Sequence, residues 1–366
     1  MASILMADLF SLAGFPDEDS GNRNDGPYVL YQGGNVLVRS IHPEKGIPKS
    51  TIQTFAEKEK VEVPVKVSFS DHPDWDFSVK LQPVLKNEPS EFKQPEKLLA
   101  LSDIEGEFEE LRKLLVANKV IDSKYNWIFS TGHVVICGDL FDRGSDVVAV
   151  IWLLYKLEQD AKAKGGYLHT ILGNHDIINL SGDLRYVMPK YFINAKLMGV
   201  DYMTLYGVDS ELGRWLRSKN LIEKIGDNLC LHAGMAPEIN KLKISVKEIN
   251  ERCRPYYDKV KQPDLFVDKA IWKLFEEAQS SLFWYRGYFQ EPKASLEEVE
   301  ETLSLYQVNR IIVGHTITET NVGFYYNGSV LGIDTNQHKG KLEGALYEAG
   351  KWYKVNERGV KSRIGD

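Results

Sequence analysis

Residues 133–144 read HVVICGDLFDRG, and residues 167–176 read YLHTILGNHD. In each stretch a short and mostly apolar run passes into a glycine and then into charged or amide side chains. Apolar runs of this length, bounded by turn residues, are typical of buried strands. Residues 147–161, between the two runs, place apolar side chains on one helical face. The whole stretch therefore predicts strand, loop, helix and strand, the unit from which α/β folds are built.

The same alternation continues on both sides of this unit. Residues 107–117 have the apolar spacing of a helix, and residues 345–355 predict a hairpin that turns at Ala349-Gly350. Further strands are expected at 98–101, 229–232, 310–313 and 329–333. We therefore expect an α/β layered domain over residues 96–366.

Residues 1–95 have a different texture. Two short apolar runs, 28–31 and 35–41, flank Gln32-Gly33-Gly34 and predict a hairpin, and residues 61–69 alternate like a strand. The prolines and charges of residues 83–95 predict a linker. We expect residues 1–95 to form a small β-rich N-terminal appendage and linker. A scaffold function would rest on this region, for example on Trp75 and Phe77, which could instead pack the appendage onto the main domain.

The composition narrows the classes of function. The 366 residues carry 45 basic and 52 acidic side chains, a net charge of −7, which argues against a protein that mainly coats nucleic acid. Three cysteines are too few for a disulfide framework and favour a reducing compartment. No apolar run reaches the roughly 20 residues that a membrane-spanning helix needs. We expect a cytoplasmic protein without nucleic-acid or membrane partners, and its oligomeric state stays open.

Five polar segments follow predicted strands, and together they indicate one site. Open α/β sheets bind ligands at the carboxyl ends of their strands. Taken singly, an aspartate at such a position is typical of a cap or turn, and a histidine of a packed side chain. All five segments, however, combine oxygen or imidazole donors with a glycine, which lets the backbone approach a ligand closely. They are Asp103–Gly106, Gly138–Gly144, Gly173–Asp176, His232–Gly234 and Gly314–Thr316.

A pair of divalent metal ions would require such a set of side chains. Two ions roughly 3.5–4 Å apart need a bridging carboxylate and further ligands from separate loops. They lower the pKa of a bound water from 15.7 to about 7 and hold phosphoryl oxygens during an in-line displacement. Carboxylates, an Asn carbonyl and neutral imidazoles suit manganese, iron or zinc.

The order D-x-x-G, GDxxDR-G, GNH-D, H-x-G and GH-T resembles the calcineurin-like metallophosphoesterases, in particular their phosphoprotein-phosphatase branch. Residues 173–187, GNHDIINLSGDLRYV, further resemble the Shewanella-like protein phosphatases, which are a bacterial-type group. The resemblance covers roughly residues 97–345. It implies a four-layer sandwich in which two mixed β-sheets lie face to face and helices flank them.

The resemblance also implies a role for individual residues. Asp103 matches a ligand of the first ion, Asp139 the bridging carboxylate, and Asn174, His232 and His315 ligands of the second ion. His175 matches the acid that protonates the leaving alcohol, Asp142 the carboxylate that orients it, and Arg143 a phosphate-binding arginine. A positioned imidazolium contributes roughly 10²–10⁴ to such a rate, and a guanidinium fork suits phosphate oxygens.

A second phosphate-binding arginine is expected in this family. Arg286, in the aromatic segment Phe283–Gly287, is one candidate, and a surface arginine stacked on Trp284 is the alternative. Arg185 is a further candidate, for which the alternative is a structural salt bridge.

Glu105 departs from the family pattern, which has a histidine at this position. A glutamate still binds metals through oxygen, and the first site would then hold the carboxylates of Asp103, Glu105 and Asp139. Such a set favours manganese, magnesium or calcium over zinc or iron. For the two ions together we expect manganese, with magnesium, iron or zinc as alternatives. The competing interpretation is loss of the first ion and of most of the activity.

These observations lead to one main hypothesis and three alternatives. We expect a phosphomonoesterase in which a metal-bridging hydroxide attacks phosphorus and His175 acts as general acid, with a phosphorylated protein (Ser/Thr or Tyr) or a small phosphoester as substrate. The alternatives are a nucleotide or dinucleoside polyphosphate hydrolase, a catalytically impaired phosphate-binding module, and a scaffold.

Overall fold

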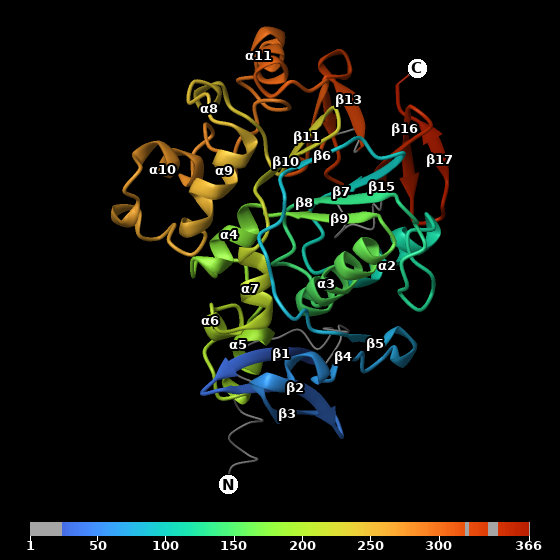
Figure 1. Cartoon of the computed structure of the whole chain (residues 1–366), viewed down its shortest axis with the longest axis vertical. Helices are drawn as coiled ribbons and strands as arrows, with labels where there is room; N and C mark the ends of the chain where they lie inside the picture. Colours follow the sequence, from blue (N-terminus) through green and yellow to red (C-terminus); the bar gives the residue numbers. More distant parts are fainter. Residues whose placement is uncertain (1–23, 319–321, 336–342, 366) are drawn as a thin grey trace.

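The computed structural model describes residues 24–318, 322–335 and 343–365. Two six-stranded mixed sheets lie at its centre, and helices cover their outer sides (Figure 1). Apolar side chains from both sheets and from the helices form the core, as the alternation of strands and helices predicts. The α/β layered sandwich expected from the sequence is thereby confirmed.

The first sheet has the strand order β17-β16-β15-β7-β8-β9. Its parallel strands β7, β8 and β9 are the predicted apolar runs, and β15 and β16 form the predicted hairpin, with Ala349 and Gly350 between them. The helices α2 and α3 connect the parallel strands, and α3 is buried along most of its length because it packs against both β9 and the N-terminal strand β1. The bounds are β7 Lys97–Leu101, α2 Phe108–Ala117, β8 His133–Cys137, α3 Val147–Ala163, β9 Tyr167–Ile171, β15 Glu343–Glu348, β16 Lys351–Asn356 and β17 Lys361–Arg363.

The second sheet has the order β13-β14-β12-β11-β10-β6. Its strands β11, β12 and β14 were predicted, whereas β6 lies within the predicted linker and pairs in parallel with β10. The bounds are β6 Glu91–Phe92, β10 Ile222–Ile225, β11 Asn228–Leu231, β12 Arg310–Val313, β13 Gly323–Tyr325 and β14 Val330–Gly332.

The remaining helices follow β9 and β11. Ser245 and Ser295 precede α9 and α11 and form capping boxes. Each serine hydroxyl accepts a hydrogen bond from the backbone amide of the glutamate three residues later, and the side chain of that glutamate accepts one from the serine amide. The bounds are α4 Asn174–Leu180, α5 Pro189–Leu197, α6 Tyr202–Leu205, α7 Glu211–Arg217, α8 Pro237–Asn240, α9 Val246–Cys253, α10 Lys269–Phe275 and α11 Leu296–Tyr306, with short 3₁₀ turns at Glu57–Glu62, Pro73–Trp75, Arg254–Tyr256, Pro263–Leu265 and Tyr326–Gly328. Within the part of the chain that the structure describes, every helix is too short or too polar to cross a bilayer.

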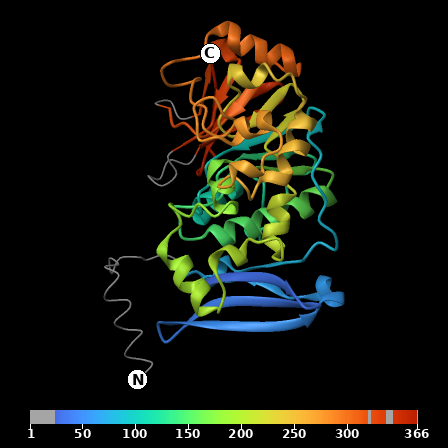
Figure 2. The same cartoon turned by 90° about the vertical axis from the view of Figure 1, so that its left-hand side faces the viewer.

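The N-terminal strands form a sheet of their own, β1-β2-β3, which is a separate layer at one end of the molecule (Figure 2). The predicted hairpin is present, and Gly33 and Gly34 both take positive φ in its turn. Only β4 forms within the predicted strand 61–69, because a 3₁₀ turn precedes it. The bounds are β1 Asp25–Gln32, β2 Asn35–Glu44, β3 Ile47–Ala56, β4 Val65–Val67 and β5 Phe77–Val79.

This sheet is bonded to the helices of the main body. The indole of Trp152 on α3 donates to the Pro27 carbonyl over 2.7 Å, and the amide of Asn194 on α5 donates to Asp25 over 2.9 Å. Buried residues of β1 and of the first sheet belong to one continuous hydrophobic cluster. The N-terminal layer therefore shares its core with the rest of the chain.

Candidate metal centre

The loops that follow five strands meet at one place. The backbone amide of His315, after β12, donates to the Asp103 carboxylate, after β7, over 3.0 Å. The amide of His175 donates to Asp139 over 2.9 Å. Asp103, Asp139 and His315 have positive φ angles of 52°, 57° and 63°. Non-glycine residues take this conformation at a cost, which is characteristic of functional sites.

The His232 imidazole is the centre of one group of ligands. Its Nε2 lies 2.7 Å from the Asn174 carbonyl oxygen, 3.1 Å from Nδ1 of His315 and 3.2 Å from an Asp139 oxygen. Its Nδ1 is 2.8 Å from the Cys137 carbonyl, to which it donates. This bond holds the ring so that Nε2 faces the other three groups, as in histidines that bind metals.

Glu105, Asp139 and His175 form a second group, whose potential ligand atoms lie within 4.8 Å of one another. Asp139 also belongs to the first group, with His232 and His315. The Glu105 carboxylate contacts the Arg143 guanidinium and faces His175 over 4.0 Å. A carboxylate shared by two groups of ligands is the arrangement that a pair of metal ions requires.

The surroundings of these side chains fit cations. The Nε2 of His315 is buried without a hydrogen-bond partner. Burial raises the pKa of Asp103 and Asp334, and neighbouring carboxylates raise both further. Burial, with the charges of His232 and Arg286, lowers the pKa of His315, so this imidazole is neutral, the form that binds metals. A divalent ion held by this group of ligands would neutralise the crowded carboxylates.

His175 is held by a chain of buried hydrogen bonds. Its Nδ1 lies 2.6 Å from Asp142, whose other oxygen accepts from the Asn179 amide over 2.8 Å, and Tyr202 donates to Asn179 over 2.9 Å. Burial opposes the charged imidazole, but Asp139 and the bond to Asp142 outweigh it and raise the pKa of His175. The chain leaves Nε2 facing the cavity.

The three predicted arginines have different surroundings. Arg143 and Arg286 both line the cavity around the ligands. Arg286 also donates to the His315 carbonyl over 2.7 Å, while Trp284 packs edge-on against the His315 ring. The structure does not bring Arg185 to this cavity, because its guanidinium forms ion pairs with Asp183 and Glu277. The sequence had left this alternative open.

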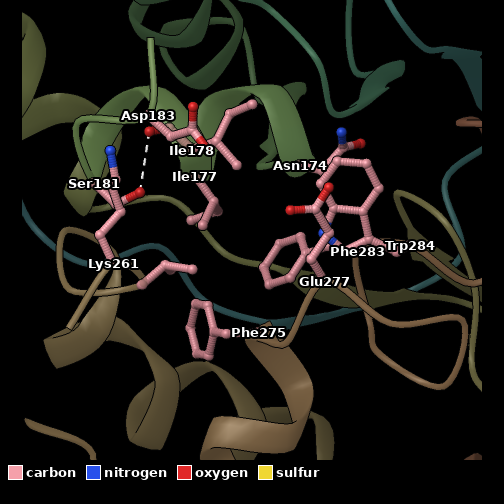
Figure 3. A pocket seen from close by; sticks show the side chains of 11 residues that line it. Asn174, Ile177, Ile178, Ser181, Asp183, Lys261, Phe275, Glu277, Phe283 and Trp284 are labelled. Atoms are coloured by element: carbon pink, nitrogen blue, oxygen red, sulfur yellow. Dashed lines mark hydrogen bonds between the residues drawn. The ribbon is translucent and has the colours of Figure 1, made fainter. Parts of the chain in front are cut away.

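The cavity itself has a volume of about 480 Å³. A smaller cavity of about 40 Å³ lies beside it and shares Asn174 and Trp284 (Figure 3). The larger cavity is lined by Asp103, Glu105, Asp139, Arg143, Asn174, His175, Tyr186, Trp284, Arg286, Gln290, His315, Ile317, Asp334 and Thr335. Every metal ligand and catalytic residue expected from the sequence therefore lines it, apart from His232 and Asp142, which lie behind its wall.

Sequence reasoning missed several residues of this site. The sequence assigned no role to Asp176, yet its carboxylate accepts from the amides of Asp139, Leu140 and Gly173. Asp334 follows the apolar run 329–333 just as the predicted ligands follow theirs, and this signal could have identified it. No sequence pattern points to Asn179, Tyr186 or Tyr202, because only the folded chain brings them next to Asp142 and His175.

The thiols of the three cysteines take no part in the proposed chemistry. Cys137, Cys230 and Cys253 are buried and unbridged. Burial raises the pKa of the Cys137 and Cys253 thiols. A buried thiol with a raised pKa is a poor nucleophile, so the chemistry belongs to the oxygen and imidazole groups.

Comparisons with known proteins agree with this geometry. The family model "Calcineurin-like phosphoesterase" matches residues 96–319. Among curated proteins, Shewanella-like protein phosphatase 2 of Arabidopsis thaliana is 26% identical over 69% of this chain and 74% of its own length. Shewanella-like protein phosphatase 1 of Plasmodium berghei is 29% identical over 73% of each chain.

Among solved structures, the cold-active protein-tyrosine phosphatase of a psychrophilic Shewanella species is similar with a TM-score of 0.82 and 34% identity. The match covers 93% of this chain and 99% of that one. The family expected from the sequence is thereby confirmed: this chain belongs to the calcineurin-like phosphoesterases and is a metal-dependent phosphoester hydrolase.

Proposed function

We propose that this chain is a protein phosphatase that uses two divalent metal ions. The observation that carries the proposal is Asp139, whose carboxylate lies within ligand distance of His232 and His315 and also of Glu105, next to the His175–Asp142 pair. The two curated relatives and the solved structure described above are all named as protein phosphatases, which supports a phosphorylated protein as the substrate.

Two sets of residues would hold the ions. Asp103, Glu105 and Asp139 would bind one ion, and Asp139 with Asn174, His232 and His315 would bind the other. The oxygen-rich first set favours manganese. Bound ions supply polarisation of the phosphoryl oxygens and a lowered pKa for a water molecule.

The chain's own residues do the rest. Arg143 and Arg286, on the wall of the same cavity, would bind the phosphate oxygens and orient the ester bond. His175 would carry a proton on Nε2 and donate it to the leaving oxygen as the bond to phosphorus breaks. Asp142, 2.6 Å from Nδ1, would keep the ring oriented and charged through this transfer.

The role of Glu105 can be tested by elemental analysis of purified wild type and Glu105→His. We expect two ions per chain in both proteins, because either side chain offers a ligand atom. One ion in the wild type would show that the first site is lost and would support the impaired binding module.

The catalytic assignment can be tested with p-nitrophenyl phosphate and added manganese. We expect His175→Ala to lower kcat at least 100-fold, in line with the contribution of a general acid, while manganese binding measured by calorimetry is retained. Equal rates for the two proteins would remove His175 from the mechanism.

The substrate class can be tested by comparing phosphopeptides with dinucleoside polyphosphates at equal concentration. We expect the higher kcat/KM on phosphopeptides. Faster hydrolysis of the dinucleoside polyphosphates would establish the alternative hydrolase.

A further inference from the structure

The mouth of the cavity carries an exposed aromatic ring directly beside the proposed general acid. Tyr186, in the loop between α4 and α5, lines the cavity, and its ring centre lies 5.0 Å from that of His175 at an interplanar angle of 50°. The residue is 42% exposed. Its ring therefore has one side against His175 and another side open to whatever enters the cavity.

The loop that carries Tyr186 is held from two sides. Arg185 donates from Nε to Asp183 over 3.1 Å and from Nη1 and Nη2 to Glu277 over 3.3 and 3.2 Å. Asp183 and Glu277 come from different segments and lie on different walls of the small cavity (Figure 3). The Arg185 guanidinium also lies 5.8 Å from the Tyr186 ring. These contacts connect the loop of Tyr186 to the segment that carries Glu277.

Other apolar side chains line the same cavity. The Trp284 ring packs edge-on against His315, with ring centres 5.9 Å apart, and Ile317 is 52% exposed. Both residues line the cavity together with Tyr186. The site thus combines carboxylates, imidazoles and arginines, which suit a phosphate, with apolar surface that suits a ring.

We propose that Tyr186 is a specificity-determining residue that selects an aryl phosphate, the ester of a tyrosine side chain, over an alkyl phosphate such as that of serine. This inference rests on the proposed function. His175 must reach the leaving oxygen, so the group attached to that oxygen lies next to Tyr186. In a phosphotyrosine this group is a ring, which packs against the tyrosine ring. In a phosphoserine it is a single methylene followed by polar backbone, which leaves the ring face uncovered.

The test compares two peptides of one sequence, phosphorylated on tyrosine or on serine, and the small esters phenyl phosphate and glycerol 2-phosphate. Wild type, Tyr186→Phe and Tyr186→Leu are assayed on all four substrates. Tyr353→Leu, on β16 away from the cavity, serves as the matched control. Thermal unfolding of each variant shows that it is folded.

For wild type we expect a higher kcat/KM on the aryl member of each pair. In Tyr186→Leu, kcat/KM on the aryl substrates falls about tenfold while the alkyl substrates stay within about twofold, and Tyr186→Phe behaves like wild type. A loss of equal size on aryl and alkyl esters would overturn the proposal, because it would reduce Tyr186 to a support for His175. An unchanged rate on the aryl esters would overturn it as well.

The failure of the proposed function gives a different result. A wild-type enzyme that hydrolyses neither peptide, yet hydrolyses the small esters, is no protein phosphatase. The comparison of phenyl phosphate with glycerol 2-phosphate then still decides the role of Tyr186.

Discussion

At the scale of single residues, His175 depends on side chains that never face the cavity. The hydrogen bonds from Tyr202 to Asn179 and from Asn179 to Asp142 are buried and keep the carboxylate in one orientation. A general acid loses much of its effect when its ring rotates by a small angle, because proton transfer requires a short and aligned hydrogen bond.

We therefore predict that Asn179→Ala lowers kcat on p-nitrophenyl phosphate about tenfold and leaves KM within about twofold. Tyr202→Phe removes only the outer bond, and a smaller effect of about threefold is expected. Steady-state kinetics with saturating manganese provides the measurement. A rise in KM at constant kcat would show that Asn179 acts in substrate binding instead.

A second residue, His133, links stability to pH. Its Nδ1 lies 2.9 Å from Nε2 of His169, whose Nδ1 lies 2.6 Å from Glu223. Burial, together with the neighbouring His169, lowers the pKa of His133 to about 4. Between pH 6.5 and pH 4 the unfolded chain therefore binds more protons at this position than the folded chain, so the free energy of unfolding falls as the pH falls.

Between pH 6.5 and pH 4, we predict that the free energy of unfolding falls by about 1 kcal/mol less in His133→Gln than in wild type. This value is kept small because the His133 side chain is partly exposed and solvent screens its charge. Urea unfolding of both proteins at pH 7, 6, 5 and 4 measures it. Parallel curves of unfolding free energy against pH would contradict the prediction.

At the scale of elements, the loop after β8 owes its shape to α4. Asp176, in the first turn of that helix, accepts hydrogen bonds from the backbone amides of Asp139 and Leu140 over 3.0 and 2.8 Å. The helix thereby fixes the position of the bridging carboxylate. Gly173 lies so close to Asp139 that a Cβ there would collide with its side chain.

We predict that Asp176→Ala destabilises the protein by about 3 kcal/mol, because it leaves several buried amides without an acceptor. It should also weaken manganese binding at least tenfold, since the loop loses its support. Chemical unfolding and calorimetric titration test the two effects. Asp183→Ala, outside the larger cavity, is the control, and an equal loss of metal affinity there would refute a specific role for Asp176.

The sequence predicted the loops of the site wherever one short run combined an apolar strand pattern with a potential metal ligand. The loops at Asp139, Asn174 and His315 each combine an apolar strand, a glycine and a ligand, so their convergence followed from the rule that strand ends meet. The strand β10 escaped notice because Glu223, within it, looks like a surface residue until His169 provides its partner. The strand β6 has only two residues and gains its pairing from β10.

Residues without a local signal could not be placed in this way. Arg185 stands beside the phosphate-binding pattern in sequence, yet two carboxylates hold it elsewhere, and one of them is 92 positions away. Asn179 likewise lies among residues that form an ordinary helix. Its role in orienting Asp142 becomes visible only from its hydrogen bonds with Tyr202 and Asp142. Such pairings depend on tertiary contacts rather than on periodicity.

At the scale of the whole molecule, the proposed ligands come from both large sheets. Asp103 and Asp139 follow strands of the first sheet, whereas His232 and His315 follow strands of the second. Bound ions would therefore connect the two layers, and an ion that binds only the folded chain stabilises it.

We predict that removal of metal with a chelator lowers Tm by about 5–10 °C, and that added manganese restores it. Differential scanning calorimetry measures the change. His315→Ala should show a smaller shift because it removes one ligand from the second sheet. An identical Tm with and without metal would contradict a role of the ions in joining the sheets.

The boundary near residue 95 also belongs to this scale and stays a prediction. In the N-terminal layer, the Pro27 carbonyl accepts a hydrogen bond from Trp152 and the Tyr31 hydroxyl donates one to Glu211. Trp152 and Glu211 are both buried. We expect deletion of residues 1–90 to give an insoluble or noncooperatively unfolding protein, because these partners lose their bonds and apolar surface is exposed. A soluble, active fragment with a sharp thermal transition would establish that residues 1–95 and residues 96–366 are separate domains.

The burial of Cys137, Cys230 and Cys253 matters under oxidative stress. Hydrogen peroxide attacks accessible, acidic thiolates and converts them to sulfenic and then higher acids. Enzymes that remove phosphate through such a thiolate stall when peroxide rises. Since this chain buries its three thiols and the proposed mechanism uses none of them, peroxide would not stop dephosphorylation through a cysteine, as it does in thiolate-dependent enzymes.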